Sequence, residues 1–339
     1  MPSLAVDAAS IFAERSQIVG FVWAGAYLGT TCAFPTAGAL IESGAGWQSV
    51  FYLAGGAGAI WVVLWWLVVS DRPETDRYIT ASERRYITSS LPPSLDPSTP
   101  VPWRTILSQS SVWGVVAGHT AHNWLFYTLL TYLPSYLKSE LGFDIKTSGV
   151  VSVLPYLGCF LGSSGSGQLA DRLIKSHGWS VVWTRRTFQV LFEVSAGVVL
   201  VLAGYTSDVV VAVVCVTASV TFVGAGSAGG YAPNILDLAP FHGGILMGIS
   251  NTIATLPGII SPVLTGYIVQ SKTRSARSAD EWREVFWLGL GVALVGNIIF
   301  AVLARGTEVR ELCQPEGESA MPKAAPSTAS TAPLIDADA

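Results

Sequence analysis

The amino-acid sequence predicts an all-α protein that crosses a membrane several times, and three observations predict it. Half of the 339 residues are hydrophobic and only 12% are charged, about half of the roughly 25% typical of soluble domains. The mean hydropathy is +0.48. The charges are also segregated, which leaves long windows without any charge. Apolar windows of this length indicate membrane-spanning helices rather than the shorter, alternating strands of a β-barrel.

Eight stretches are apolar enough to cross a bilayer as helices, which need about 20 residues each. They lie at residues 17–41, 50–70, 111–136, 148–169, 186–206, 209–231, 244–269 and 284–305. An even number of spans places both termini on one side of the membrane. If that side is the cytosol, cytosolic segments hold most of the 19 Lys and Arg residues, as the positive-inside rule requires. We therefore predict an integral membrane protein with cytosolic termini. No tail motif selects a lysosomal, vesicular or plasma membrane.

The spans fall into two groups that a polar segment separates. The predicted parts are residues 1–70 with two spans, a cytosolic linker at 71–110, six spans within 111–305, and a tail at 306–339. In the linker, Thr80 and Glu83 have the spacing of a capping box, which predicts a short helix. A proline-rich run follows and breaks regular structure. The tail is rich in Pro, Ala, Ser and Thr, a composition typical of disorder.

The third span carries a polar and aromatic face. His119, His122, Asn123 and Tyr127 recur at the i, i+3, i+4 spacing that places side chains on one side of a helix. Such groups are costly against hydrocarbon and normally face a bundle interior or a wet cavity. We therefore predict that this face lines a transport path and binds substrate. Asn251, in the polar part of the seventh span, is a further substrate-binding candidate.

The two histidines of this face form an H-x-x-H pair. As metal ligands they would need at least one more donor, and no Cys, Asp or Glu lies in their span. We therefore predict no metal site and no cofactor. One interpretation gives a histidine a hydrogen-bonded structural role. The other has the pair bind an anionic substrate or move protons, because histidine titrates near neutral pH.

Glu193 is the one carboxylate that lies well inside a predicted span. An acid within the membrane is by default a candidate proton or ion site, so Glu193 is a candidate for coupling. Alternatively, Glu193 pairs with Arg185 or Arg186, about 10 Å away along the helix, or reaches cytosolic water.

A charged motif joins the fourth and fifth spans. Gly167, Asp171 and Arg172 close the fourth span, and Arg185 and Arg186 open the fifth. An aspartate at a cytosolic helix end can bind arginines or a helix N-terminus across the loop, which would latch two helices in one conformation. We predict a gating loop. The alternative is a simple charge cluster that sets the orientation in the membrane.

Two later spans contain residues that interrupt helices. The sixth closes on glycines and Pro233, and the seventh holds Pro257 and Pro262. Discontinuous helices often build the substrate sites of carriers. No segment has a nucleophile elbow, a P-loop or a dinucleotide-binding motif, so we predict a transporter and not an enzyme. The expected partners are the lipid bilayer and a small solute, without nucleic acid, and the oligomeric state is open.

Several segments resemble a known family. Residues 167–172 resemble the loop motif of the major facilitator superfamily, and residues 123–134 resemble helix 7 of sialin and the vesicular glutamate transporters. Helices 8, 10 and 11 and the flanks of helix 5 of that family are similar to residues 154–157, 234–240, 244–258, 14–16 and 46–52. The resemblance covers about residues 14–305. It implies two six-helix lobes with the substrate bound between them. It also implies transport of organic anions or phosphate, coupled to H⁺ or Na⁺.

The resemblance implies a partial major facilitator fold. The eight spans correspond to family helices 5 to 12, which are the last two of the N-lobe and a complete C-lobe. The substrate-coordinating arginine of helix 1 and acid of helix 4 have no counterpart in the chain. We therefore expect a truncated isoform, a fragment or an incomplete gene product that does not transport alone. The hypothesis that competes with an anion carrier is a non-transporting truncated protein that associates with or interferes with full-length transporters.

Single residues carry over from the family only in part. His119 matches a histidine of sialin-like sequences. His122 stands where vesicular glutamate transporters have an arginine and sialin has a tyrosine, which argues against glutamate as the substrate. Arg185 and Arg186 arrive later than the superfamily pattern expects, and Glu193 has no evident family equivalent.

Overall fold

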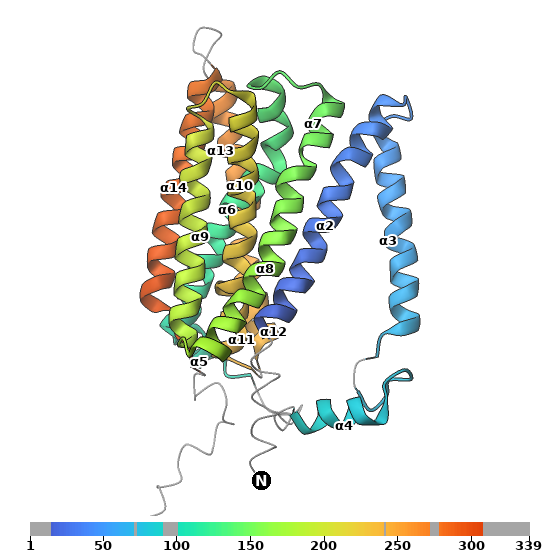
Figure 1. The fold of residues 1–339 in the computed structure, drawn as a ribbon, viewed down its shortest axis with the longest axis vertical. Helices are drawn as coiled ribbons and strands as arrows, with labels where there is room; N and C mark the ends of the chain where they lie inside the picture. Colours follow the sequence, from blue (N-terminus) through green and yellow to red (C-terminus); the bar gives the residue numbers. More distant parts are fainter. Residues whose placement is uncertain (1–14, 71–72, 91–100, 241, 272–277, 308–339) are drawn as a thin grey trace, which may run out of the picture.

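The computed structural model describes residues 15–70, 73–90, 101–240, 242–271 and 278–307, and its regular elements there are all α-helices (Figure 1). They are α2 (Arg15–Glu42), α3 (Gln48–Val68), α4 (Ala81–Ser90), α5 (Trp103–Ser108), α6 (Ser110–Ser139), α7 (Ile145–Val151), α8 (Val153–His177), α9 (Val181–Ala203), α10 (Val209–Gly229), α11 (Tyr231–Leu238), α12 (Gly243–Ala254), α13 (Pro257–Ser271) and α14 (Ser278–Leu303). The predicted all-α class is confirmed. The predicted linker prolines at 91–100 and the tail beyond residue 307 lie outside the described residues.

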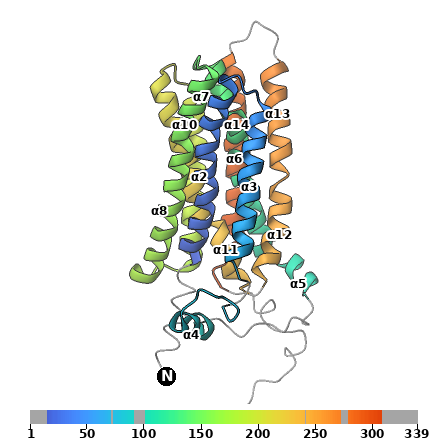
Figure 2. The ribbon, with the colours of Figure 1, turned by 90° about the vertical axis from the view of Figure 1, so that its right-hand side faces the viewer.

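The long helices stand side by side in one bundle (Figure 1). Helix α6 packs against α12, α13 and α14, while α10 packs against both α8 and α9. Helix α2 lies along α8, and α3 packs against α2. Figure 2, viewed from the α3 side, shows α3 roughly parallel to the bundle helices. Helix α6 is therefore central to the arrangement, and α2 closes the bundle on the α8 side.

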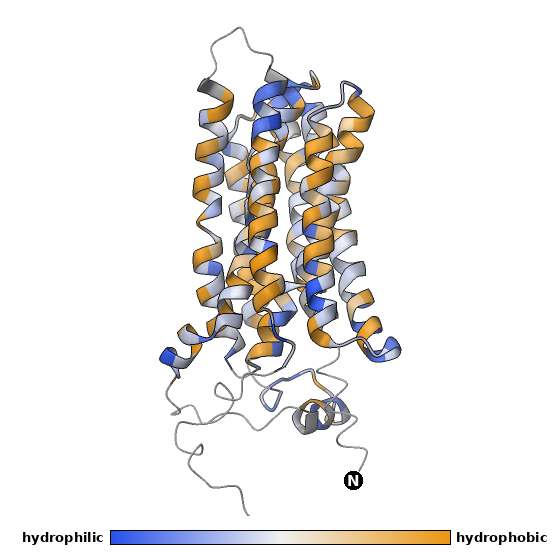
Figure 3. Ribbon diagram, turned by 90° about the vertical axis from the view of Figure 1, so that its left-hand side faces the viewer, coloured by the Kyte–Doolittle hydropathy of each residue, from blue (hydrophilic) through white to orange (hydrophobic). Residues whose placement is uncertain are grey.

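Six segments in the described part of the chain are long and apolar enough to cross a membrane by length and composition. They are Gln48–Val68, Lys146–His177, Val181–Ala203, Val209–Leu238, Gly243–Val269 and Asp280–Leu303. Figure 3 shows hydrophobic residues along most of the length of the helices that face the viewer. Helices α2 and α6, the other two predicted spans, are 28 and 30 residues long and run beside them. Helix α6 is less apolar because it carries the predicted polar face, which agrees with a position inside a membrane-embedded bundle.

The two predicted interruptions occur where glycine and proline stand. Helix α10 ends at Gly229, and Gly230 has the non-helical angles φ −105° and ψ −109° before α11 begins. A side chain at Gly230 would collide with Gln189, so only glycine fits there. Between α12 and α13, Pro257 has no N–H to continue the ladder of hydrogen bonds. Both breaks lie within candidate membrane spans, Val209–Leu238 and Gly243–Val269.

The ends of the predicted linker contact structured parts of the protein. The Glu83 backbone N–H donates to Thr80 Oγ1 at 3.2 Å, so the predicted cap of α4 is confirmed. At the other end, the Ile106 side chain of α5 is fully buried in a cluster with Val112 and Val115 of α6. Residues 103–108 therefore pack onto the bundle before α6 begins.

Candidate functional site

The polar face of α6 is turned into the bundle, where its side chains bind α12 and α13. His119 Nδ1 lies 2.9 Å from Ser250 Oγ, and Asn123 Nδ2 donates to the Ala254 carbonyl at 2.7 Å. Thr128 and Ser261 also share a hydrogen bond between their hydroxyls. Ala254 ends α12 just before the proline break, where carbonyls lose their helical donors. The break thus provides an acceptor that Asn123 uses.

The second histidine of this face pairs with the intramembrane acid. His122 Nδ1 lies 2.7 Å from Glu193 Oε1, which joins α6 to α9. The two side chains are 4% and 0% exposed. Gly226 of α10 gives the carboxylate its space, since a Cβ there would lie 2.9 Å from Glu193 Oε1. The second carboxylate oxygen, Oε2, is buried without a hydrogen-bond partner among the described residues.

Aromatic rings cover the pair. The Tyr231 ring stacks on His119 with 4.4 Å between centroids and lies 5.4 Å from His122. Phe126 is parallel to the His122 ring at 6.0 Å. Tyr27 of α2 meets Phe126 edge-on at 5.8 Å and is itself buried. The cover is therefore assembled from α6, α11 and α2.

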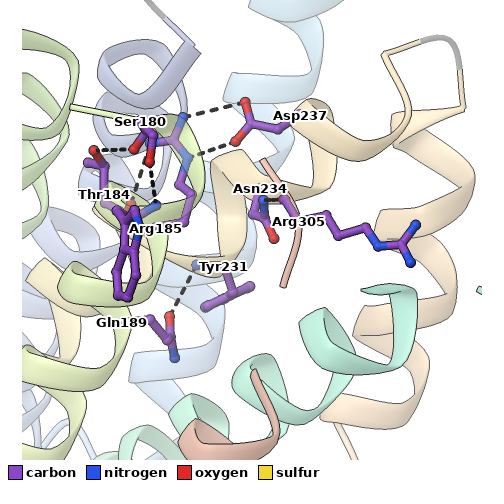
Figure 4. A network of polar contacts seen from close by, with 10 residues as sticks. Ser180, Thr184, Arg185, Gln189, Tyr231, Asn234, Asp237 and Arg305 are labelled. Atoms are coloured by element: carbon purple, nitrogen blue, oxygen red, sulfur yellow. Dashed lines mark hydrogen bonds and ion pairs between the residues drawn. The ribbon is translucent and has the colours of Figure 1, made fainter. Parts of the chain in front are cut away.

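Helix α9 carries a buried polar stripe that ends in Glu193. Arg185, Gln189 and Glu193 are four residues apart, so they share one face of the helix, and each is buried. Gln189 Nε2 donates to Asn297 Oδ1 at 3.0 Å. Figure 4 shows the other bond of this side chain, in which Gln189 Oε1 accepts from the Tyr231 backbone N–H at 3.1 Å. Hydrogen bonds from these three side chains connect α9 to α6, α11 and α14.

The first residue of the stripe forms the second buried ion pair. Arg185 Nε donates to Asp237 Oδ2 at 2.7 Å, and Nη2 lies 3.5 Å from Oδ1 (Figure 4). Arg185 Nη1 also donates to the Gly229 carbonyl at 3.4 Å, next to the break before α11. Arg186 instead donates to the Ala304 carbonyl at 2.8 Å. Both predicted gating arginines thus hold helix ends together at the same end of the bundle.

The remaining predicted residues take no part in the buried contacts described above. Asn251 is exposed on α12, and Tyr127 is half-buried beside Gly258 of α13. Asp171 is buried, and together with Arg172 it lines a cavity of about 470 Å³ at the end of α8. Gly167 is buried where α2 approaches α8. Substrate binding by Asn251 and Tyr127, and gating by the loop, stay predictions.

One alternative for Glu193 is overturned. The side chain neither pairs with Arg185 or Arg186 nor reaches water, because it is fully buried and bonded to His122. Sequence reasoning missed the partners Gln189, Asp237 and Ser250. The i, i+4 spacing from Arg185 to Glu193 was a usable signal for the polar stripe. Among the residues that the structure describes, no group of three or more metal-binding side chains occurs.

The chain matches a known family along most of its length. The profile of the Major Facilitator Superfamily matches residues 1–262. Sialin of Ovis aries is 40% identical over 294 residues, which cover 86% of this chain and 58% of the sialin. Sialin of Homo sapiens is 39% identical with the same coverage. A sodium-dependent phosphate transport protein of Arabidopsis thaliana chloroplasts is 32% identical, over 87% of this chain and 56% of that protein.

The chain thus spans less than two thirds of the length of these curated relatives. A solved bacterial homologue of the human lysosomal transporter Spinster, inward-facing and unoccupied, matches with a TM-score of 0.45 and 12% identity, over 74% of this chain and 64% of that chain. The expected resemblance to sialin-type transporters, and to transporters rather than enzymes, is confirmed.

Proposed function

Because this chain belongs to the Major Facilitator Superfamily, we propose that it contributes to the transport of small anions across a membrane by alternating access. The proposed substrate is an organic anion or phosphate, and the proposed coupling ion is H⁺ or Na⁺. A relative named as a sodium-dependent phosphate transport protein supports phosphate as a substrate, and the resemblance to sialin supports an organic anion. In alternating access, two lobes rock around a central site and expose it first to one side and then to the other.

The observation that carries the proposal is the buried polar face of α6. His119, His122 and Asn123 lie inside a membrane-embedded bundle and bond to α12 and α9 instead of turning to water. Polar groups are rare in this position and mark substrate or ion pathways. A purely structural bundle would be expected to fill the same positions with apolar side chains. In this proposal Tyr127 and Asn251 complete the anion site.

The end of the bundle that contains the loop between α8 and α9 would control the conformation of the carrier. Asp171 and Arg172 lie at the end of α8, and Arg185 holds α11 through Asp237. We assign these residues to one gate, which closes when the helix ends are held together. The distribution of Lys and Arg supports a cytosolic position for both chain termini in this proposal.

Uptake into proteoliposomes tests the function. The chain is reconstituted alone, and the accumulation of sialic acid, glutamate and phosphate is measured with an inward H⁺ gradient, an inward Na⁺ gradient or neither. Accumulation of sialic acid or phosphate that needs one gradient supports the proposal, identifies the coupling ion and contradicts the expectation that the chain does not transport alone. Accumulation that no gradient changes contradicts cation coupling. Empty liposomes give the background.

Thiol labelling tests the orientation. Cys313 lies in the tail, so a variant that keeps only this cysteine reports on the side of the C-terminus. We expect an impermeant maleimide to label it only after the plasma membrane of whole cells is opened. Labelling in intact cells contradicts a cytosolic C-terminus.

The exposure of α3 favours a second candidate function. In it, the chain associates with a complete transporter and does not transport alone. All of the side chains of α3 are solvent-accessible, and α2 is the element against which this helix packs. An apolar helix whose side chains are exposed in the described part of the chain offers a surface for the helices of another transporter. Co-purification with a full-length sialin, together with no uptake by the chain alone, supports this candidate. Gradient-driven uptake by the chain alone contradicts it.

A further inference from the structure

The pair of His122 and Glu193 is only half satisfied. Glu193 Oε1 is bonded to the imidazole at 2.7 Å, while Oε2 is buried without a partner among the described residues. Buried carboxylates that serve only structure usually have both oxygens hydrogen-bonded, because an unbonded charge in a low dielectric is costly. The orphaned oxygen is therefore a place where a proton can be held.

The charge of this site is determined by His122 and Glu193 and not by the groups around them. The titratable groups that face it are His119 from α6, Tyr27 from α2, Cys159 from α8 and Tyr231 from α11. Helix α10 contributes Gly226, which has no charge. Tyrosine and cysteine are ordinarily neutral near pH 7. In the part of the chain that the structure describes, the imidazole of His122 is the group that faces Glu193 with a positive charge when it is protonated.

Counting protons gives the consequence. With one proton shared between the imidazole and the carboxylate, the pair is neutral in total. A second proton, placed on the carboxylate, leaves a charged imidazolium beside a neutral acid, so the pair carries +1. That charge matches one singly charged oxyanion, such as a carboxylate or a monobasic phosphate. Proton and anion together leave the loaded site neutral, which lowers the cost of moving it through hydrocarbon.

Access to the pair depends on α2. Tyr27 lies on Phe126, and Phe126 lies over the His122 ring. Helix α2 packs along α8 and holds this cover in place. If the lobes rock, as the proposed function requires, a shift of α2 removes Tyr27 and exposes the pair to water. The same movement that opens the anion site would then open the proton site.

We propose that His122 and Glu193 form a one-proton site, loaded when α2 moves away, and that its positive charge retains one singly charged oxyanion on the α6 face. This inference rests on the proposed function, because only a carrier brings the anion and the lobe movement. It adds the proton site, the stoichiometry of one proton per anion, and the charge class of the substrate.

Infrared spectroscopy of the chain in lipid nanodiscs tests the proton site without transport. The carbonyl stretch of protonated carboxylic acids is recorded while the pH is lowered, with and without sialic acid or phosphate. We expect one acid band that appears at higher pH when the anion is present and that is lost in Glu193→Gln. The control Glu281→Gln, which removes another buried carboxylate at the start of α14, keeps the band. A band that Glu193→Gln leaves unchanged overturns the proposal.

Proton counting tests the coupling. A pH indicator measures the protons taken up when sialic acid or phosphate binds, with about one proton per anion expected in the native chain. Glu193→Gln should reduce that uptake, and gradient-driven accumulation, at least tenfold, while the exchange of internal for external anion continues. His122→Gln, which keeps the acid, should weaken anion binding by a similar factor. Binding without proton uptake overturns the proposal.

The two tests distinguish a failure of the proposed function from a failure of the proposed proton site. If the native chain binds neither anion at any pH, the proposed function fails, and the infrared band still decides whether Glu193 takes a proton. If anions bind and accumulate but the band does not belong to Glu193, the proton site fails and the function stands. Circular dichroism and gel filtration confirm that Glu193→Gln is folded, since the amide has the shape of the acid.

Discussion

Two buried ion pairs lie in the same bundle, and they differ in how completely they are bonded. Arg185 and Asp237 meet through two nitrogens and both carboxylate oxygens, and Arg185 also holds the Gly229 carbonyl. His122 and Glu193 share one contact of 2.7 Å, and the other carboxylate oxygen has no hydrogen-bond partner among the residues that the structure describes. The first pair is complete, and the second has room for a proton.

The chemistry of the cation explains the difference in role. The guanidinium of Arg185 does not lose its proton in proteins, so its pair can only be made or broken. An imidazole can bind or release a proton, so the pair of His122 and Glu193 can change charge while it stays in place. The first arrangement suits a latch between helix ends, and the second suits an ion site. Four changes to the chain test this comparison.

The largest effect is expected when the complete pair is cut. Asp237→Asn removes the carboxylate that two Arg185 nitrogens contact, and the loss of one partner of a buried ion pair costs about 3–5 kcal/mol in the free energy of unfolding. Thermal unfolding in detergent should show a large loss of stability. The double variant Arg185→Met with Asp237→Leu should recover most of it, because apolar replacement of a whole buried pair is often close to neutral. A double variant no better than the single one contradicts the latch.

A smaller effect is expected when the carboxylate of the incomplete pair is displaced. Gly226→Ala places a Cβ about 2.9 Å from Glu193 Cγ and Oε1, so the side chain must shift and the bond to His122 weakens. Overpacking of this kind costs about 1–3 kcal/mol. The same thermal assay measures it, with Gly291→Ala as the control. Gly291 has open space around it, and alanine there should be neutral or stabilise by up to about 1 kcal/mol.

The amide substitution in the incomplete pair should have little effect on stability. Glu193→Gln makes the same chemical change as Asp237→Asn, but it removes a charge whose partner can become neutral. The amide keeps a hydrogen bond to His122, so we expect a change of no more than about 1 kcal/mol. Equal losses for the two amide variants in thermal unfolding would remove the distinction between the pairs.

The smallest effect on stability is expected outside both pairs. Asn251 is exposed on α12, and surface substitutions usually stay within about 0.5 kcal/mol. Asn251→Ala should therefore unfold at the same temperature as the native chain. It should bind sialic acid or phosphate more weakly, which titration calorimetry can measure. Unchanged affinity would remove Asn251 from the proposed anion site.

Patterns between residues close in the sequence were enough to predict the helices of this protein. Apolar windows predicted the spans, Thr80 and Glu83 predicted the cap of α4, and Gly230 and Pro257 stand at the breaks. Helical spacing also placed His119 and His122 on one face. These features depend on backbone sterics, hydrogen bonds within one helix and the length of a bilayer crossing, all of which act between residues close in the chain.

The partners of the polar side chains were decided by tertiary structure alone. Glu193 binds His122, 71 residues away, although Arg185 and Arg186 lie closer in the sequence. Arg185 binds Asp237, 52 residues away, through a short helix that exists because α10 breaks at Gly230. Helical periodicity determines which side of a helix a residue occupies. Which neighbour that side meets depends on how the helices pack, and that packing is spread over the whole chain.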